Sequence, residues 1–337
     1  MNGLSPLTPS TLSHGSPRPP AASDEWLQDL ELMHHYTSKT SRSELGSGHA
    51  MKHLWQENIP LEATKHPFLM HGILALSALH IAATVPSKPA AYLQISDKHH
   101  VIAVSSFREL LSEPVTDDQG NALFALSMVL SVSSLARASL RTVERPERRF
   151  MALEDVVELL YMTRGVRDVV DTTYETVSRG PFSVALHGHQ AVPSAAHALA
   201  PQLKACFSAL SSLCDDISDP EKSRLCMEAV TDLQTVYETA VQTHATQALH
   251  SGHIFRWVAE RSYEFLKLVQ TRHPPALVIT AYFFVSTGML EHSWYLRDLA
   301  QLGFNGVANA LEADYGKHLA YARELIASDL AVMKSGR

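Results

Sequence analysis

Residues 67–83 read PFLMHGILALSALHIAA, and this stretch decides the fold class. Pro67 suits the first turn of a helix, where a missing N–H leaves no bond unmade, and Pro86 ends the segment. The residues between them are apolar on nearly every side of a helix instead of along one stripe. Such a helix is typical of the centre of a large bundle, so we expect other helices to surround it.

Further helices are predicted on both sides of this one. A second strongly apolar run, ALFALSMVLSVSSLA, covers residues 122–136. Amphipathic periods predict helices at about 51–55 (closed by Asn58-Ile59-Pro60), 90–111, 147–170 (with a break at Gly165), 203–213, 222–243, 254–270, 275–290, 292–312 and 317–333. Residues 174–198 show no sustained period, and strand-like alternation is absent throughout. The fold class is therefore all-α, a multi-helix bundle.

The N-terminal residues differ in composition from the rest. Residues 1–22 are rich in Ser, Pro, Thr and Gly, which predicts a disordered arm. Order should begin at Ser23, an N-cap, with Trp26, Leu27, Leu30 and Met33 on one face of the first helix. We expect residues 23–337 to form one large helical domain.

Composition limits the function classes. Of 337 residues, 45% are apolar and 19% charged, which is typical of a folded globular chain, and the net charge of −7 disfavours contact with nucleic-acid phosphates. The cysteines Cys206, Cys214 and Cys226 lack CxxC spacing and are expected as free thiols in a reducing compartment. We find no uninterrupted apolar run of about 18 residues and no signal peptide, so a cytosolic or nuclear chain without a membrane helix is predicted.

The strongest enzyme-like motif is the DDxxD pattern formed by Asp215, Asp216 and Asp219. Helical terpene synthases use such carboxylates to hold Mg²⁺ against a diphosphate. The second metal motif of those enzymes is not found downstream, and Pro220 directly follows the third aspartate. We therefore favour an Asp-rich turn that caps the next helix, and keep a Mg²⁺-dependent terpenoid enzyme as an alternative.

Metal binding is a further hypothesis, because the chain has nineteen histidines. It would centre on His187, His189 and His197, but HExxH and CxxC spacings do not occur. Hydrolase, P-loop and dinucleotide motifs are not found either. We predict no catalytic residue, no metal ligand and no cofactor.

Other polar groups have structural interpretations. His71 and His80 lie in the apolar helix and are expected in the core, bonded to backbone or water. Two histidine pairs, 34–35 and 99–100, are expected on helix surfaces. The one basic concentration is interpreted as a solvated loop and contains Arg137, Arg141, Arg145, Arg148 and Arg149.

A ligand pocket is the remaining candidate site. The central and C-terminal helices have an excess of large apolar and aromatic residues, which either form plain core or line a cavity between helices, where bundles commonly place ligands. The candidate residues are Met70, Leu74, Phe124, Met128, Phe283, Phe284, Met289, Trp294 and Tyr295.

Two stretches resemble the C-terminal regulatory region of fungal zinc-cluster transcription factors, particularly the branch that includes the sterol uptake control regulators. The first is LELMHHYTSKTSRSEL at 30–45, continued by Leu54-Trp55 and by HPFLMHGILALSALHIA at 66–82. The second is RHPPALVITAYFFV at 272–285, followed by HSWYL at 292–296. A shorter likeness is GVR at 165–167. Together these cover about residues 24–335, although 174–250 contributes little.

The resemblance implies an architecture. Family members place a six-cysteine, two-zinc DNA-binding cluster before a Ser/Pro-rich linker and this helical domain. A linker-like arm is present here, but the three cysteines do not form the cluster. We therefore expect no direct DNA binding by this chain alone: either the cluster is missing from the gene product, or the chain acts through a partner.

The resemblance also implies a function. In the sterol regulators, a sterol in a hydrophobic pocket holds the factor inactive. We expect a non-enzymatic transcription regulator of sterol, lipid or secondary-metabolite genes, working in the nucleus or shuttling to it. Its expected partners are a sterol-like hydrophobic small molecule and a protein partner or second copy. A cluster-less inhibitor that dimerises with an intact zinc-cluster factor stays open as a third interpretation.

Overall fold

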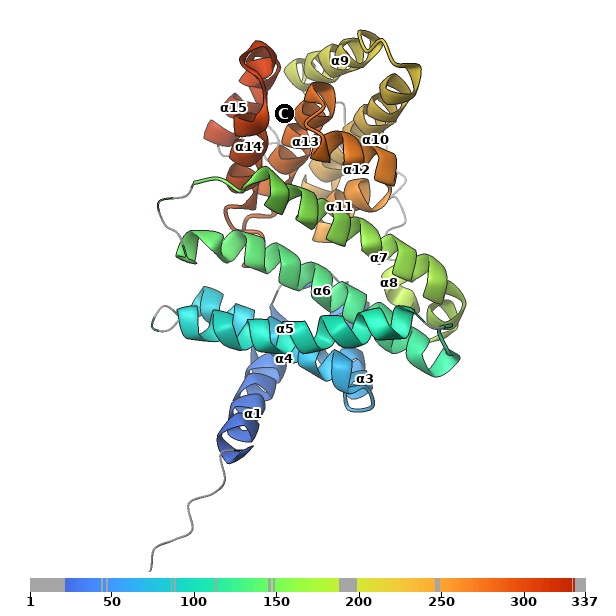
Figure 1. Cartoon of the computed structure of the whole chain (residues 1–337), viewed down its shortest axis with the longest axis vertical. Helices are drawn as coiled ribbons and strands as arrows, with labels where there is room; N and C mark the ends of the chain where they lie inside the picture. The colour runs from blue at the N-terminus through green and yellow to red at the C-terminus, as the bar shows by residue number, and fades with distance from the viewer. Residues whose placement is uncertain are drawn as a thin grey trace, which may run out of the picture.

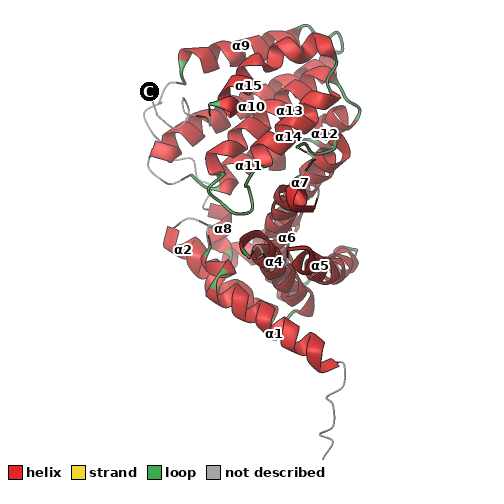
Figure 2. Ribbon diagram, turned by 90° about the vertical axis from the view of Figure 1, so that its left-hand side faces the viewer, coloured by secondary structure: helices red, strands yellow, loops and turns green. Residues whose placement is uncertain are grey.

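The computed structural model is built from helices joined by short connections (Figure 1). It describes residues 22–330, apart from 44, 47, 86, 88, 113, 145, 146, 148, 188–198, 246–248 and 329. No β-strand occurs among these residues (Figure 2), which confirms the predicted all-α fold class. The predicted N-terminal arm lies outside the described residues except for Ala22, where the first helix begins.

The helices of the first half form the lower and middle layers of Figure 1, with α6 and α7 crossing above α4 and α5. They are α1 (Ala22–Ser38), η1 (Thr40–Arg42), α2 (Gly48–His53), the π-helical turn η2 (Leu54–Asn58), α3 (Ile59–Ala63), α4 (Pro67–Thr84), α5 (Pro89–Leu111), α6 (Asp117–Glu144), α7 (Leu153–Arg179) and α8 (Ser183–His187).

The helices of the second half form the upper layer, with α13 in its centre. They are α9 (Pro201–Asp215), α10 (Pro220–Ala245), α11 (Ser251–Ala259), α12 (Tyr263–Gln270), α13 (Pro274–Thr287), η3 (Gly288–Leu290), α14 (Leu299–Ala310), η4 (Ala313–Leu319) and α15 (Ala320–Ala327).

Helix α4 confirms the prediction of a buried central helix. It packs against α1, α5 and α6, and residues 72–82 are all buried. Gly72 permits the close approach to α6, because a Cβ atom there would stand 2.5 Å from Cδ1 of Leu126. The two strongly apolar stretches of the sequence therefore pack directly against each other.

Helices α4 and α6 are also long and apolar enough to cross a membrane, by length and composition alone. Inside the bundle, 72% of the α4 window and 78% of the α6 window are buried. Burial of this kind is what core helices of a bundle need, so packing accounts for their apolar character without a membrane.

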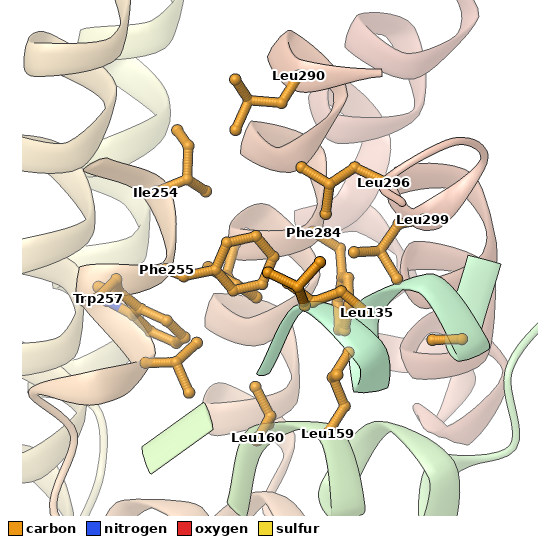
Figure 3. Close-up of a cluster of buried hydrophobic side chains, with 14 of the residues drawn as sticks. Leu135, Leu159, Leu160, Ile254, Phe255, Trp257, Phe284, Leu290, Leu296 and Leu299 are labelled. Atoms are coloured by element: carbon orange, nitrogen blue, oxygen red, sulfur yellow. The ribbon is translucent and has the colours of Figure 1, made fainter. Parts of the chain in front are cut away.

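One contiguous cluster of buried apolar side chains runs from Tyr36 to Leu330 and joins both halves of the chain. Figure 3 shows part of it, where Leu135 of α6, Leu160 of α7, Phe255 of α11 and Phe284 of α13 gather. One domain over residues 23–337 stays a prediction.

The helix predicted to close at Asn58-Ile59-Pro60 does not end there, so that prediction is wrong. Leu54–Asn58 form a π-helical turn, and Pro60 then lies in the first turn of α3. A proline is tolerated there because the missing N–H falls where the regular hydrogen-bond pattern is already interrupted.

The predicted end of α7 near residue 170 is also wrong. The helix passes through Gly165 without a break, continues to Arg179, and is followed by the short α8. Its second half buries Val169, Thr173 and Val177, spaced four residues apart. Part of the supposedly aperiodic region 174–198 is therefore helical, and residues 188–198 lie outside the described residues.

Helix boundaries in the C-terminal third differ from the prediction in three places. The predicted helix 254–270 is divided into α11 and α12, because the Ser262 hydroxyl accepts a hydrogen bond from the Phe265 N–H and caps α12. Residues 292–298 form turns, and the left-handed backbone of Asp298 (φ 61°) precedes α14. The last helix begins at Ala320 after the 3₁₀ segment η4.

Candidate functional site

The two stretches that resemble the fungal regulators meet in space. The indole Nε1–H of Trp294, in the turns before α14, donates a hydrogen bond to the hydroxyl of Ser43 after η1, at 3.0 Å. The ring of Trp294 also lies 4.7 Å from that of His80 on α4. We name Ser43, His80, Trp294, His35 and Thr40 the junction cluster, since they connect the first helices to the C-terminal half.

His80 is the centre of the junction cluster. Its Nδ1 lies 3.0 Å from Oγ1 of Thr40 and 3.2 Å from Nε2 of His35. Burial, with a smaller contribution from the neighbouring His35, lowers the pKa of His80 to about 4. A neutral imidazole has one acceptor nitrogen, so His80 holds α1 and η1 against α4 as a hydrogen-bonded but uncharged group.

Tyr295 extends the junction to the middle of the bundle. Its carbonyl oxygen accepts a hydrogen bond from the Ser139 hydroxyl of α6 at 3.0 Å, and its own hydroxyl lies 3.2 Å from Oγ of Ser251 at the start of α11. Tyr295 is buried. Trp294 and Tyr295 therefore form hydrogen bonds with three separate parts of the chain, at Ser43, Ser139 and Ser251.

A second histidine pair joins α4 and α5. Nδ1 of His71 lies 2.9 Å from Nδ1 of His99, and Nε2 of His99 lies 3.3 Å from a carboxylate oxygen of Asp29 on α1. Burial lowers the pKa of both histidines, while Asp29 opposes that shift. The surface position predicted for His99 is wrong, because the ring is buried between helices.

The expectation for His35 also needs correction. It is half-buried and bonded to His80, whereas its neighbour His34 is exposed as predicted. His100 is half-buried as well. His80 is buried as expected, but its ring contacts the side chains of Thr40 and His35 and not the backbone or water of the prediction.

The nine residues predicted to line a pocket are distributed over the core. Leu74 belongs to a small cluster with Leu32, Ala78 and Ile81, and Met70 packs at its edge. The others lie in or against the large core cluster, and Trp294 alone among the nine joins the junction cluster. The remaining members are Phe124, Met128, Phe283, Phe284, Met289 and Tyr295.

Within the core, the aromatic residues of α13 have well-defined packing partners. The Phe283 ring stacks on Trp257 at 4.9 Å between centroids and meets Phe255 edge-on at 5.6 Å. Phe284 occupies the space that Gly303 of α14 leaves, since a Cβ there would stand 2.1 Å from its ring. In this conformation α13 is tightly packed, and the ligand role of these residues stays a prediction.

None of the nine predicted residues lines either of two of the pockets that open among the described residues. One, of about 310 Å³, lies between α10 and the α11–α12 connection beside the buried Arg261. The other, of about 600 Å³, lies between the start of α4, the end of α5 and the start of α6, and is lined by Pro67, Phe68, Ser106, Glu109, Leu110, Pro114, Thr116 and Gln119.

The DDxxD motif lies at the α9–α10 connection. Asp215 ends α9, and Oδ1 of Asp219 accepts hydrogen bonds from the backbone N–H groups of Glu221 (3.0 Å) and Lys222 (3.2 Å). This arrangement supports the capping interpretation. No group of three or more His, Cys, Asp or Glu residues within the described residues could hold a metal ion.

Two further hypotheses are only partly covered by the structure. His187 ends α8, but His189 and His197 lie outside the described residues, so a metal site there stays a hypothesis. In the basic region, Arg137 forms an ion pair with Asp97 of α5, which ties α6 to α5. Arg149 is exposed, and the side chains of Arg141, Arg145 and Arg148 lie outside the described residues.

Comparison with known proteins shows what these residues are similar to. Residues 31–143 match the family described as the fungal specific transcription factor domain. Over these residues the chain is similar to that domain. The matched residues contain every member of the junction cluster except Trp294, which lies far beyond the matched part.

Individual relatives agree with this domain assignment. A Zn(2)-C6 fungal-type transcription factor of Gibberella zeae is 25% identical over 320 residues, which is 92% of this chain and 62% of the relative. Sterol uptake control protein 2 of Candida albicans is 36% identical over 119 residues, 35% of this chain and 16% of the relative. Its namesake in Saccharomyces cerevisiae is 33% identical over 113 residues, 34% of this chain and 12% of the relative.

The likeness to zinc-cluster factors and sterol uptake control proteins predicted from sequence is therefore confirmed. The chain spans less than two thirds of the length of these relatives. The junction cluster is a group of polar side chains at one of the contacts between the matched residues and the C-terminal part of the chain.

Proposed function

We propose that this chain is the regulatory part of a fungal transcription regulator, that it acts on gene expression in the nucleus, and that it catalyses no reaction. The match of residues 31–143 to the fungal specific transcription factor domain carries this proposal. The contact of Trp294 with Ser43 supports extending the proposal to the C-terminal helices, since it ties them to the matched domain.

The ligand class proposed is a hydrophobic small molecule such as a sterol. Two relatives are named for the control of sterol uptake, and aromatic residues such as Phe283 and Trp294 lie buried close to the contacts between the halves. Burial of apolar ligand surface contributes about 25 cal/mol per Å², which makes apolar core the suitable environment. Entry of a ligand would require the side chains around α13 to repack. Binding of the ligand would therefore change the shape of the domain.

Action through a protein partner or a second copy is the remaining part of the proposal. The described helices carry no zinc-cluster cysteines, because Cys206 is half-buried and Cys214 and Cys226 are buried as free thiols in α9 and α10. DNA contact would then be made by a partner or by a segment beyond these residues. The activity of that partner would then determine whether the chain activates or inhibits transcription.

A reporter assay tests the regulatory role. The full chain would be fused to an unrelated DNA-binding module, and transcription from its cognate site measured in yeast with and without an inhibitor of sterol synthesis. We expect sterol depletion to change reporter output, and Trp294→Ala to remove that response, because Trp294 connects the two halves. Tyr174→Ala, at an exposed aromatic residue of α7, is the matched control. Output equal to that of the DNA-binding module alone under both conditions would contradict the proposal.

A binding measurement tests the ligand class separately. Tryptophan fluorescence of the purified chain would be titrated with cholesterol delivered on cyclodextrin, with cyclodextrin alone as the control. We expect a saturable change that Phe283→Trp shifts, since that residue stacks on Trp257. A flat titration would remove the sterol from the proposal while leaving the regulatory role intact.

A further inference from the structure

The hairpin formed by α9 and α10 brings two thiols together. Cys214 lies in the last turn of α9, and Cys226 lies in the second turn of α10, after a short connection. Both side chains are fully buried, and their thiols form a hydrogen bond with each other. The hydroxyl of Ser223, one turn before Cys226, donates a hydrogen bond to the Cys214 carbonyl oxygen at 2.9 Å. This bond holds the two helix ends together beside the thiol pair.

The third cysteine has a different neighbour. Cys206 lies eight residues before Cys214 on the same helix, which is about 12 Å along the helix axis. Its thiol forms a hydrogen bond with Tyr282 of α13. Two cysteines whose Cα atoms are more than about 7 Å apart cannot be bridged without movement of the backbone. Cys226 is therefore the thiol with which Cys214 can pair.

The hydrogen bond makes the two thiols chemically unequal. It lowers the pKa of Cys214, against the effect of burial, and together with burial it raises the pKa of Cys226. The Cys226 S–H therefore donates to the Cys214 sulfur. Since the thiolate is the nucleophilic form of a cysteine, Cys214 is the better nucleophile of the pair.

The pair lies close to solvent although both thiols are buried. Asp215 and Asp216, which directly follow Cys214, are exposed. Helix α9 is at the edge of the upper layer, at the top of Figure 1, and its main contacts are with α10 and α13. Local opening at such an edge costs less free energy than unfolding of the whole chain. A small oxidant can therefore reach the two sulfur atoms when this end of the hairpin opens.

We propose that Cys214 and Cys226 form a reversible oxidation site, at which a peroxide converts the two thiols into an intramolecular disulfide. The Cys214 thiolate attacks one oxygen of hydrogen peroxide, the O–O bond breaks, and the leaving hydroxide takes up the proton that Cys214 had lost. This step gives a sulfenic acid and water. The Cys226 sulfur then attacks the Cys214 sulfur, and the S–O bond breaks as the Cys226 proton leaves with the hydroxyl group as a second water. The thiols lose two electrons in total, and these reduce the peroxide.

The disulfide would fix the hairpin against the central helix of the C-terminal half. Both helices of the hairpin contact α13 at one residue, because Cys206 of α9 bonds to the Tyr282 side chain and the Tyr237 hydroxyl of α10 donates to the Tyr282 carbonyl oxygen at 2.7 Å. A bridge between α9 and α10 therefore restricts movement around α13. In a reducing compartment such a bond is transient and is reversed by thiol reductants. The inference goes beyond the proposed function and does not depend on it.

Thiol counting on the purified full chain tests the proposal. The folded protein is treated with hydrogen peroxide, the peroxide is removed with catalase, and free thiols are counted with N-ethylmaleimide in denaturant. We expect the count to fall from three to one and to return to three after dithiothreitol. Urea below the unfolding transition should speed the loss, because it favours local opening. A count that stays above one, or a loss that dithiothreitol does not reverse, overturns the proposal.

Peptide mapping of the oxidised chain identifies the bonded residues. Trypsin cuts after Lys and Arg, which places Cys226 on peptide 225–256 and both Cys206 and Cys214 on peptide 205–222. We expect these two peptides to be linked by a disulfide in the monomeric chain, and fragmentation of the linked peptides to place the bond at Cys214. A bond at Cys206, or one that joins two copies of the chain, contradicts the inference.

Three single variants provide an independent assignment. Cys214→Ala and Cys226→Ala should each abolish the linked peptides, whereas the matched control Cys206→Ala should retain them. Circular dichroism of the reduced variants shows whether each is folded. Linked peptides that persist in Cys214→Ala, or that disappear in a folded Cys206→Ala, would refute the assignment. If a variant does not fold, the map of the wild-type chain decides alone. None of these results changes the outcome of the reporter assay, so the two proposals succeed or fail separately.

Discussion

The indole of Trp294 hydrogen-bonds the hydroxyl of Ser43 at 3.0 Å although 251 positions separate them in the chain. Ser43 in turn donates to the carbonyl oxygen of Thr40 at 2.6 Å, so its hydroxyl has both a donor and an acceptor partner. A bond of this kind stabilises the native state only when both halves are folded together.

The first prediction follows from that bond. Trp294→Phe keeps an apolar ring but loses the N–H donor, and Ser43→Ala loses the acceptor; each should lower the free energy of unfolding by about 1 kcal/mol or more. In a double-mutant cycle the two changes should be less than additive, because they remove the same interaction. Urea denaturation measures all four proteins. Full additivity would show that the contact contributes nothing.

The second prediction concerns pH. His80 has a pKa lowered from its ordinary 6.5 to about 4 by burial, so between these values the unfolded chain binds a proton that the folded chain does not. Stability from His80 is complete above about pH 6.5 and is lost as the pH falls toward 4. The buried His99, whose pKa is also lowered by burial, acts in the same direction.

Denaturation across this pH range tests the prediction. His80→Gln should reduce the slope of stability against pH between 4 and 6.5, while His34→Gln, at an exposed position of α1, serves as the control. An unchanged slope in His80→Gln would mean that other groups are responsible for acid sensitivity.

The third prediction uses two glycines in helices. Gly303→Ala would place a Cβ 2.1 Å from the buried Phe284 ring, and this overpacking should destabilise the protein by roughly 1–3 kcal/mol. Gly165→Ala meets no atom within 4 Å and should stabilise α7 by up to about 1 kcal/mol. Thermal unfolding of the two variants should therefore shift in opposite directions.

The fourth prediction concerns the aspartates between α9 and α10. The backbone N–H groups of Lys222 and Glu221 lower the pKa of Asp219, so its carboxylate should stabilise the start of α10 most when ionised and less as the pH falls. Asp219→Ala should lower the unfolding midpoint, and Asp216→Asn should leave it nearly unchanged. Mg²⁺-dependent turnover of a prenyl diphosphate that Asp216→Asn abolishes would instead favour the terpenoid enzyme.

Much of the fold was predictable because local signals agreed. Helices α4 and α13 each begin at a proline and are apolar on all sides, so both the start and the burial could be inferred. The second half of α7 was missed because its buried stripe includes Thr173, whose hydroxyl donates to the Val169 carbonyl at 2.7 Å. A buried threonine that bonds within its own helix looks polar in sequence, although it behaves as core.

The junction cluster was not predictable in the same way. Trp294 and His80 were both singled out from sequence, one for a pocket and one for the core, but their contact depends on packing between distant helices. His99 looked exposed because Lys98 and His100 flank it, and its burial is set by α1 and α4. Periodicity within one helix cannot report such contacts.

The separation of Ser43 and Trp294 by 251 positions in the sequence also affects folding during synthesis on the ribosome. At 5–20 residues per second, Ser43 emerges roughly 10–50 s before its partner. During that interval the apolar sides of α6 and α7 have no C-terminal helices to cover them, and the His80 imidazole lacks the Trp294 ring. The nascent chain should therefore depend on chaperones until its last third has left the ribosome.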